Sequence, residues 1–143
     1  MRRRTYYINV VQKAMDEQKA VKTLKDIVIR FSGDSGDGMQ LTGTIFSDLS
    51  AMTGNTISTF PDFPAEIRAP QGTLSGVSGY QVQIGSRTVR TPGELADILV
   101  AMNPAALKVS VKHLKRDSII IIDTDSFTAN DLKKAEFKTE EPF

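Results

Sequence analysis

The stretch DIVIRFSGDSGDGMQLTG, residues 26–43, decides the fold class. Its first part, Ile27 to Phe31, is a nearly continuous apolar run rich in β-branched residues, which is typical of a strand covered on both faces. From Met39 onward, apolar residues recur at intervals of three and four, as they do on one face of a helix. Three glycines between the two segments let the backbone turn sharply. The order strand, glycine-rich loop, helix predicts the start of an α/β domain.

The rest of the chain predicts further strands and helices in alternation. The helix that starts at Met39 is expected to stop at the segment Thr53-Gly54-Asn55. Asn103 followed by Pro104 predicts a second helix start, because Asn caps helices and Pro is favoured at the first helical position. One more helix is expected from Thr128 to Lys134. Apolar or alternating runs predict four more strands, at residues 56–60, 80–84, 96–102 and 118–123.

This order predicts a three-layer α/β/α, Rossmann-like fold with a mainly parallel sheet, since strands that alternate with helices favour parallel pairing. Residues 118–123 are expected to form its clearest core strand. Residues 1–25, which start with three arginines, are expected to be an N-terminal extension, and residues 26–143 the domain itself. The chain stops at Phe143 without an obvious final packed element, so we expect the domain to be truncated at its C-terminus.

The composition excludes several classes of function. The chain has 143 residues, which fits one domain, and its net charge of +1 gives no electrostatic argument for binding nucleic acid or an anionic membrane. It has no cysteine, which excludes disulfides and cysteine-ligated iron–sulfur clusters within this chain. Its one histidine, His113, is expected on the solvated face of a helix rather than in a metal site. Any redox group is therefore expected on a cofactor or on another chain.

The glycine loop, residues 33–38, is the first candidate site. Its G-x-x-G-x-G spacing is neither the dinucleotide fingerprint nor a Walker A motif. Asp34 and Asp37 complement the dipole of the helix that follows and would repel a phosphate. Two interpretations stay open with equal weight. Either the glycines serve only the turn while the aspartates cap the helix, or the loop binds a cofactor with the residues Gly33, Ser35, Gly36 and Gly38.

The loop from Asp62 to Arg68 is the second candidate site, because it packs an acid, an aromatic, another acid and a base into seven residues. In a parallel sheet this loop leaves the same carboxyl edge as the glycine loop, Asn103 and residues 123–125, and open α/β sheets bind ligands at that edge. A surface loop with a local ion pair and a protein interface are the competing interpretations. We therefore expect an interface or an active-site-facing loop, with the residues Phe63, Glu66, Arg68 and Asn103.

Three motifs resemble the gamma domain of the 2-oxoacid:ferredoxin oxidoreductases. They are IRFSGDSGDGMQLTG at 29–43, FPAEIRAPQG at 63–72 and VAMNPAAL at 100–107. The form Gly-Asp-Ser-Gly-Asp-Gly is most similar to the N-terminal part of the alpha subunit in the 2-oxoglutarate-specific members of this family. The resemblance covers roughly residues 26–135, and the order of the three motifs makes it specific for the family.

The resemblance implies a role in a larger, cytoplasmic enzyme. In this family a 2-oxoacid is decarboxylated on thiamine diphosphate, electrons pass through iron–sulfur clusters to ferredoxin, and the acyl group goes to coenzyme A. The resemblance implies none of these cofactors, no catalytic residue and no metal in this chain, which would serve as an assembly or cofactor-access module. The implied partners are thiamine-binding domains of the same or another subunit, the beta subunit and, indirectly, ferredoxin, with no nucleic acid and no membrane.

Two other classes of function compete with this one. A free-standing nucleotide- or coenzyme A-binding domain is favoured by a glycine loop at the start of a helix. A pure interaction module is favoured by the long irregular segment Pro61 to Gly79, which would dock a partner subunit.

Overall fold

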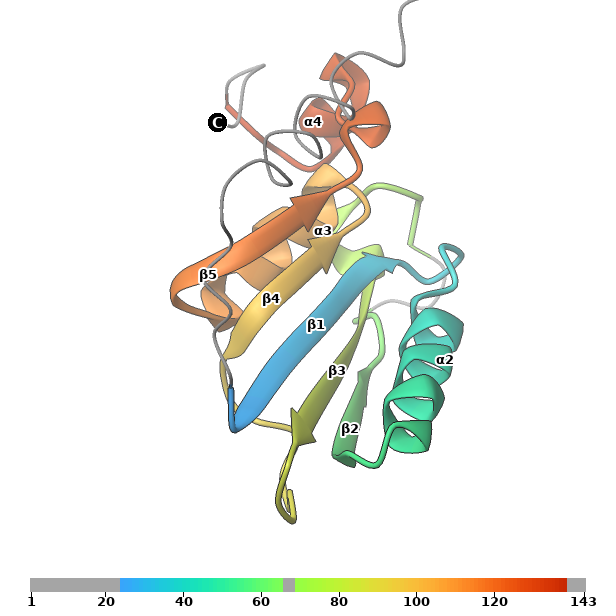
Figure 1. The fold of residues 1–143 in the computed structure, drawn as a ribbon. Coiled ribbons are helices and arrows are strands. Elements are labelled where there is room, and N and C mark those ends of the chain that lie inside the picture. The colour runs from blue at the N-terminus through green and yellow to red at the C-terminus, as the bar shows by residue number, and fades with distance from the viewer. Residues whose placement is uncertain (1–23, 66–68, 139–143) are drawn as a thin grey trace, which may run out of the picture.

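The computed structural model describes residues 24–65 and 69–138, which form one five-stranded sheet with helices on both faces (Figure 1). The strands are β1 (Asp26–Asp34), β2 (Thr56–Asp62), β3 (Val77–Gly85), β4 (Ala96–Ala101) and β5 (Leu114–Ile122). The helices are α2 (Met39–Met52), α3 (Pro104–Ser110) and α4 (Ala129–Lys134), with short 3-10 turns at Leu74–Gly76, Val111–His113 and Thr124–Ser126. Every strand and helix named above from the sequence is present, so the predicted α/β class is confirmed.

The strand order is β2-β3-β1-β4-β5, which places β1 at the centre of the sheet. β1 pairs with β4 in parallel and with β3 antiparallel, while β2 is antiparallel to β3 and β5 is parallel to β4. Only β3 therefore runs against the other four strands, and the sheet is mixed rather than purely parallel. The carboxyl ends of β1, β2, β4 and β5 meet at one edge, which we call the carboxyl edge.

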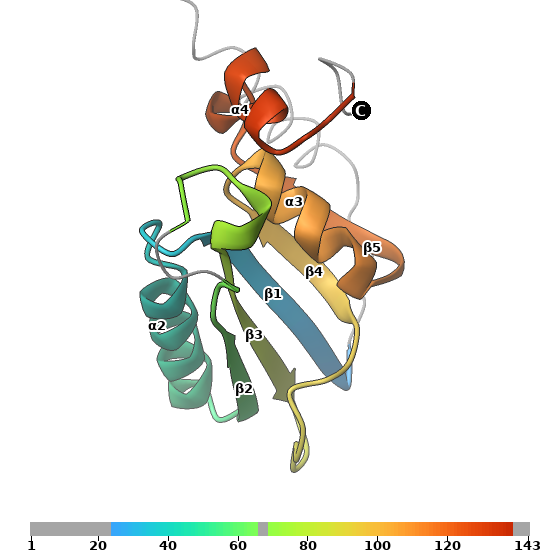
Figure 2. The ribbon, with the colours of Figure 1, turned by 180° about the vertical axis from the view of Figure 1, so that it is seen from behind.

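The sheet separates two apolar clusters, and the two ribbon views show α2 on one of its faces and α3 on the other (Figures 1 and 2). One cluster combines Phe31 and Val82 of the sheet with Met39 of α2. The other combines Leu99 of the sheet with Leu107 of α3. The three-layer α/β/α arrangement is thus confirmed. Within the described residues, no helix combines the length and apolarity needed to span a membrane.

Local signals fix the ends of α2 and α3. Gly38 precedes α2 with a φ of 73°, a left-handed conformation that glycine adopts without strain, and no side chain caps this end. The interpretation in which Asp34 and Asp37 cap α2 is therefore wrong. Asn103 does cap α3 as predicted, since its Oδ1 accepts a hydrogen bond from the Ala106 N–H at 2.8 Å.

Strand β5 differs from its prediction as a core strand. It is the last strand of the sheet formed by the described residues, and Ile119 and Ile121 are 59% and 51% exposed. Their partners in β4 are Ile98 and Val100, which pack in the cluster on the α2 side. The apolar run was interpreted correctly as a strand, but a run of isoleucines does not reveal whether a neighbouring element covers it.

The packing of α2 on the sheet depends on Gly43. A Cβ atom at this position would lie 2.1 Å from Cδ1 and 2.3 Å from Cγ of the Tyr80 ring. We expect Gly43→Ala to lower the free energy of unfolding by about 1–3 kcal/mol, because the clash outweighs the better helix propensity of Ala. Urea denaturation would measure this, with Gly36→Ala as the matched control, since nothing lies within 4 Å of a Cβ there. Equal midpoints for the two variants would contradict the close approach.

Candidate functional site

The carboxyl edge holds a cavity of about 410 Å³ between the glycine loop, the end of β4 and the start of α4. Asn103 and Gly72 form part of its wall. Its ionisable lining consists of five aspartates and one lysine: Asp34, Asp37, Asp123, Asp125, Asp131 and Lys134. We call this the acidic cavity. The expectation that the glycine loop, Asn103 and residues 123–125 gather at one edge is confirmed.

Asp34, the last residue of β1, is the most buried of these acids at 5% exposure. Its Oδ2 accepts a hydrogen bond from the Gly72 N–H at 2.8 Å, whereas its buried Oδ1 has no partner within hydrogen-bond geometry among the described residues. Burial raises the pKa of Asp34, and the negative charge of Asp37 adds to this effect. The Gly72 amide, the Asn103 side chain and Lys134 act in the opposite direction. The carboxylate is therefore less stable here than in water.

The glycine loop takes its shape from its own aspartate. Asp37 Oδ2 accepts a hydrogen bond from the Asp34 N–H at 2.8 Å. Gly33 is buried in β1. A Cβ atom at this position would lie 2.9 Å from Asp37 Oδ2, so this arrangement of the loop favours glycine here. Ser35 and Gly36 are exposed and line a second, smaller cavity of about 290 Å³ together with Asp34.

Phe63, the one described residue apart from Asn103 among those expected on the interface or active-site-facing loop, does not line the acidic cavity. Phe63 is 70% exposed and lines a separate cavity of about 570 Å³ on the α3 face of the sheet. Glu66 and Arg68 fall outside the described residues. Of the two described residues among the four expected on the interface or active-site-facing loop, Asn103 lies at the edge beside the glycine loop and Phe63 does not line that cavity.

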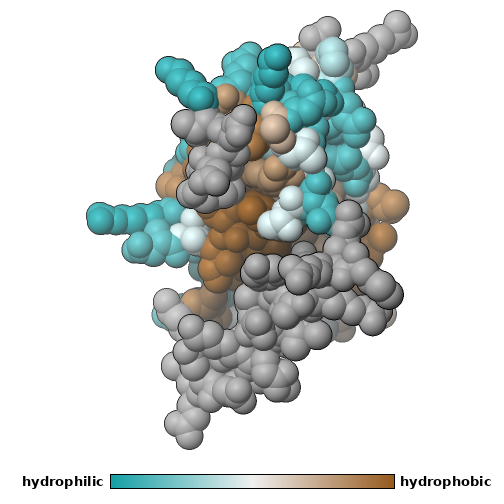
Figure 3. Space-filling view, turned by 90° about the horizontal axis from the view of Figure 1, so that it is seen from above, coloured by the Kyte–Doolittle hydropathy of each residue, from teal (hydrophilic) through white to brown (hydrophobic). Residues whose placement is uncertain are grey.

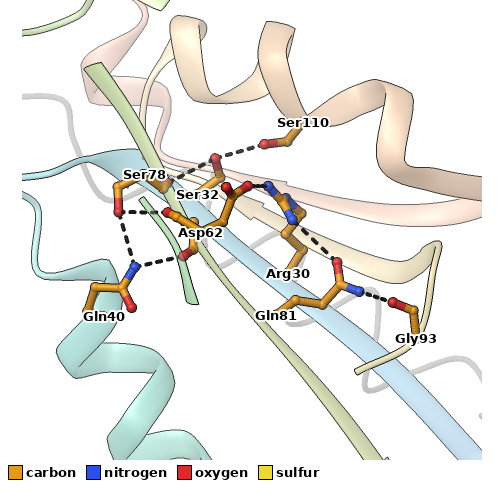
Figure 4. A network of polar contacts seen from close by, with 9 residues as sticks. Arg30, Ser32, Gln40, Asp62, Ser78, Gln81, Gly93 and Ser110 are labelled. Carbon is orange, nitrogen blue, oxygen red and sulfur yellow. Dashed lines mark hydrogen bonds and ion pairs between the residues drawn. The ribbon is translucent and has the colours of Figure 1, made fainter. Parts of the chain in front are cut away.

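The 570 Å³ cavity contains a polar network that the sequence analysis missed (Figure 4). Arg30, in the middle of β1, is 4% exposed and forms an ion pair with Asp62 at the end of β2. Gln81 of β3 accepts a weak hydrogen bond from Arg30 Nη1 at 3.4 Å and donates to the Gly93 carbonyl at 2.6 Å. The buried Nε of Arg30 has no hydrogen-bond partner in the part of the chain that the structure describes. A single arginine inside an otherwise apolar buried run was the available signal, since such a charge needs a partner.

His113 also lines this cavity and is only half-exposed, in contrast to the solvated helix face expected for it. The reason is that α3 stops at Ser110 and tightens into a 3-10 turn, which changes the side chain's direction. Burial lowers the pKa of His113, and the positive charges of Arg30 and Lys112 lower it further, while Asp62 opposes them.

The side chains present do not fit the cofactors of the resembling enzymes. The chain has no cysteine for an iron–sulfur cluster. Carboxylates line the one edge that has a glycine loop, and they repel the diphosphate of thiamine diphosphate and the phosphates of coenzyme A. Within residues 24–65 and 69–138, no group of three His, Cys, Asp or Glu side chains could hold a metal ion. No chemical step is therefore assigned to this chain.

Fold and site together define a Rossmann-like α/β domain whose carboxyl edge is acidic and whose last described strand is β5. Comparison with known proteins places it further. The chain belongs to the pyruvate ferredoxin/flavodoxin oxidoreductase family, whose model matches residues 28–142. It is 51% identical over 116 residues to the 2-oxoglutarate oxidoreductase subunit KorA of Mycobacterium tuberculosis, an alignment that covers 81% of this chain and 18% of that protein.

Two solved structures share the fold. The 2-oxoglutarate:ferredoxin oxidoreductase from Magnetococcus marinus, with 2-oxoglutarate, coenzyme A and succinyl-CoA bound, matches 71% of this chain and 17% of its own, with a TM-score of 0.62 and 29% identity. The keto/oxoacid ferredoxin oxidoreductase gamma subunit from Geobacter sulfurreducens matches 71% of this chain and 53% of its own, with a TM-score of 0.56 and 24% identity. The chain thus spans less than a fifth of the length of the two 2-oxoglutarate oxidoreductases.

Removal of the Asp62 carboxylate should leave the Arg30 guanidinium buried without a counter-charge. Because Asp62 is 43% exposed and water can partly replace it, we expect Asp62→Ala to cost about 1–3 kcal/mol of unfolding free energy, less than a fully buried pair. Chemical denaturation would show this, with Asp26→Ala at the exposed start of β1 as control. The same Asp62→Ala change should cost less in an Arg30→Met background. Equal costs in both backgrounds would contradict the pairing.

The buried carboxyl of Asp34 should make stability depend on pH. Its folded pKa is raised above the ordinary 3.8, so the folded state binds a proton more tightly than the unfolded state. Ionisation of the Asp34 carboxyl therefore destabilises the folded state. The destabilisation grows as pH rises above about 3.8, and it is complete once the pH is well above the raised pKa of Asp34. Asp34→Asn keeps an acceptor for Gly72 and removes the term. We expect its stability relative to wild type to increase between pH 4 and pH 7 in denaturant titrations, and a difference that stays constant over this range would contradict the prediction.

Proposed function

We propose that the chain is the gamma-type domain of a thiamine diphosphate- and ferredoxin-dependent 2-oxoacid oxidoreductase, comprising residues 26–143, and that it serves assembly rather than chemistry. The 51% identity to a subunit named for 2-oxoglutarate supports 2-oxoglutarate as the substrate of the complete enzyme, with succinyl-CoA as its product. The partners in this proposal are the thiamine-binding domains, the beta subunit and, indirectly, ferredoxin. Thiamine diphosphate, the iron–sulfur cluster and coenzyme A would be bound by those partners in a cytoplasmic complex.

One observation carries the proposal: the apolar side chains exposed on the α2 side of the molecule. Ile119 and Ile121 project from β5 on the face that α2 leaves uncovered, beside the half-buried Ile98 and Val100 of β4. Helix α2 itself exposes four large apolar residues, Leu41, Ile45, Leu49 and Met52. We call these six exposed residues the apolar surface. Exposed apolar side chains of this size and number are typical of surfaces that another polypeptide covers.

Hydrophobic residues also reach the surface at the end of the molecule seen from above, and hydrophilic residues lie along part of their border (Figure 3). None of the other described strands pairs with the outer edge of β5, so its backbone groups there could pair with a neighbouring element.

Co-purification with the other subunits of the oxidoreductase would test the proposal. The double substitution Ile119→Thr and Ile121→Thr removes about 1 kcal/mol of apolar burial at each position, so we expect binding to weaken about tenfold or more. Val111→Thr, equally exposed but on the 3-10 turn after α3, is the matched control. The isolated chain should not reduce viologen with a 2-oxoacid, thiamine diphosphate and coenzyme A. Reduction by the isolated chain, or unchanged binding by the double variant, would contradict the proposal.

A further inference from the structure

Acidic residues directly follow the β5 part of the apolar surface. Ile119 and Ile121 lie on the face that α2 leaves uncovered, and β5 ends one residue after Ile121. Asp123 and Asp125 come next, in the lining of the acidic cavity. Among the described residues, no Lys, Arg or His forms an ion pair with either aspartate. A segment that fits this part of the molecule therefore needs apolar side chains with cations next to them.

One segment of this chain has that composition. Residues 6–11, Tyr-Tyr-Ile-Asn-Val-Val, contain five apolar or aromatic side chains, and the three arginines at 2–4 precede them. Both stretches lie outside the described residues. No Asp or Glu occurs before Asp16, so no acid within residues 2–11 neutralises the arginines.

The order of these residues along the chain matches the order along β5. Strands β1 and β5 run parallel to each other through β4, so the chain enters β1 at the edge where β5 begins (Figure 1). Counting back from Leu24, the connecting residues 12–23 come first, then the apolar residues 6–11, then the arginines. From the same edge upward along β5, the two exposed isoleucines come first and then the two aspartates.

The connecting residues are long enough for this placement. Ile119 pairs with Ile98, which pairs with Ile29, so Ile119 lies two strands from β1 and level with a residue three positions after Asp26. This is about 10 Å across the sheet and about 10 Å along it, from the usual strand spacing and rise. The twelve residues 12–23 span about 18 Å even as a helix and about 40 Å when extended, so residues 6–11 can reach the isoleucines.

We propose that residues 2–11 of this chain dock on the β5 part of the apolar surface before assembly, and that a partner polypeptide then displaces them. The apolar side chains of the segment would cover Ile119 and Ile121, and its arginines would lie beside Asp123 and Asp125. Only the displacement step rests on the proposed function. Burial of a few apolar side chains and the entropy cost of ordering ten residues are of similar size, so a partner can compete with the docked segment.

The first experiment locates the segment in the 143-residue chain. Because the chain has no cysteine, Asn9→Cys provides a single site for a nitroxide spin label. We expect the label to broaden the NMR signals of the backbone amides of residues 119–121 and to leave those of β2, at the other end of the sheet, sharp. Ile8→Asp with Val10→Asp should abolish the broadening, because carboxylates would enter an apolar surface. The matched change in the connecting residues, Ala20→Asp with Val21→Asp, should preserve it.

A second pair of variants tests the charged contact. Asp125→Asn removes an exposed carboxylate that forms no ion pair with the described residues, and should reduce the broadening at least twofold. Glu94→Gln makes the same charge change in the cavity on the α3 face and should have no effect. Equal broadening at both ends of the sheet would overturn the proposal. Broadening that survives Ile8→Asp with Val10→Asp, or is unchanged by Asp125→Asn, would also overturn it.

The second experiment tests displacement, by co-purification with the other subunits of the oxidoreductase. Ile8→Asp with Val10→Asp leaves the apolar surface uncovered and should raise the affinity severalfold, because a larger fraction of the chain is competent to bind. Ala20→Asp with Val21→Asp should leave the affinity unchanged. Equal affinities of wild type and both variants would overturn the displacement. Failure of the wild-type chain to co-purify would refute the proposed function, while the spin label would still decide whether residues 2–11 dock on β5.

Discussion

The buried charge of Arg30 is the constraint on which the arrangement of the sheet depends. A guanidinium in the central strand must be paired, and its partners Asp62 and Gln81 come from β2 and β3. One side chain therefore holds three strands in a single register. The pairing also explains Gly79 of β3, where a Cβ would lie 3.1 Å from Arg30 Nη2. Because β1 and β2 both pair antiparallel with β3, the carboxyl end of β2 lies at the same edge as that of β1.

That edge then determines what the domain can bind. Open α/β sheets place ligands at the carboxyl ends of their strands, and a glycine loop at the start of a helix usually indicates a phosphate. Here Asp37 folds back onto the loop and accepts the Asp34 N–H, so one donor that could have faced a ligand is already used. The remaining carboxylates make the edge electronegative. The glycine loop therefore has the geometry of a phosphate-binding loop, but its carboxylates disfavour an anion. The spacing of its glycines alone could not decide between a simple turn and a cofactor site.

The sequence predicted local features well and long-range features poorly. The end signals of α2 and the cap of α3 depend on neighbouring residues, so Gly54 and Asn103 could be interpreted directly. The placement of the glycine loop, Asn103 and residues 123–125 at the carboxyl edge could be predicted from the alternation of strands and helices alone. By contrast, the ion pair of Arg30 with Asp62 joins residues 32 positions apart, and no local pattern announces it. The exposure of Ile119 likewise depends on which strand is last in the sheet, a property of topology rather than of composition.

The exposure on β5 follows from simple geometry. A helix is about 10 Å wide and strands lie about 4.8 Å apart, so one helix covers roughly two or three strands. Helix α2 packs mainly on β1, β2 and β3, which leaves β4 and β5 without cover on that face. The described residues offer no second long helix for it, so the cover must come from outside them. One helix therefore covers only part of this face of the five-stranded sheet. Exposed apolar side chains on β5 are what one expects where another polypeptide segment packs against the sheet and extends the core.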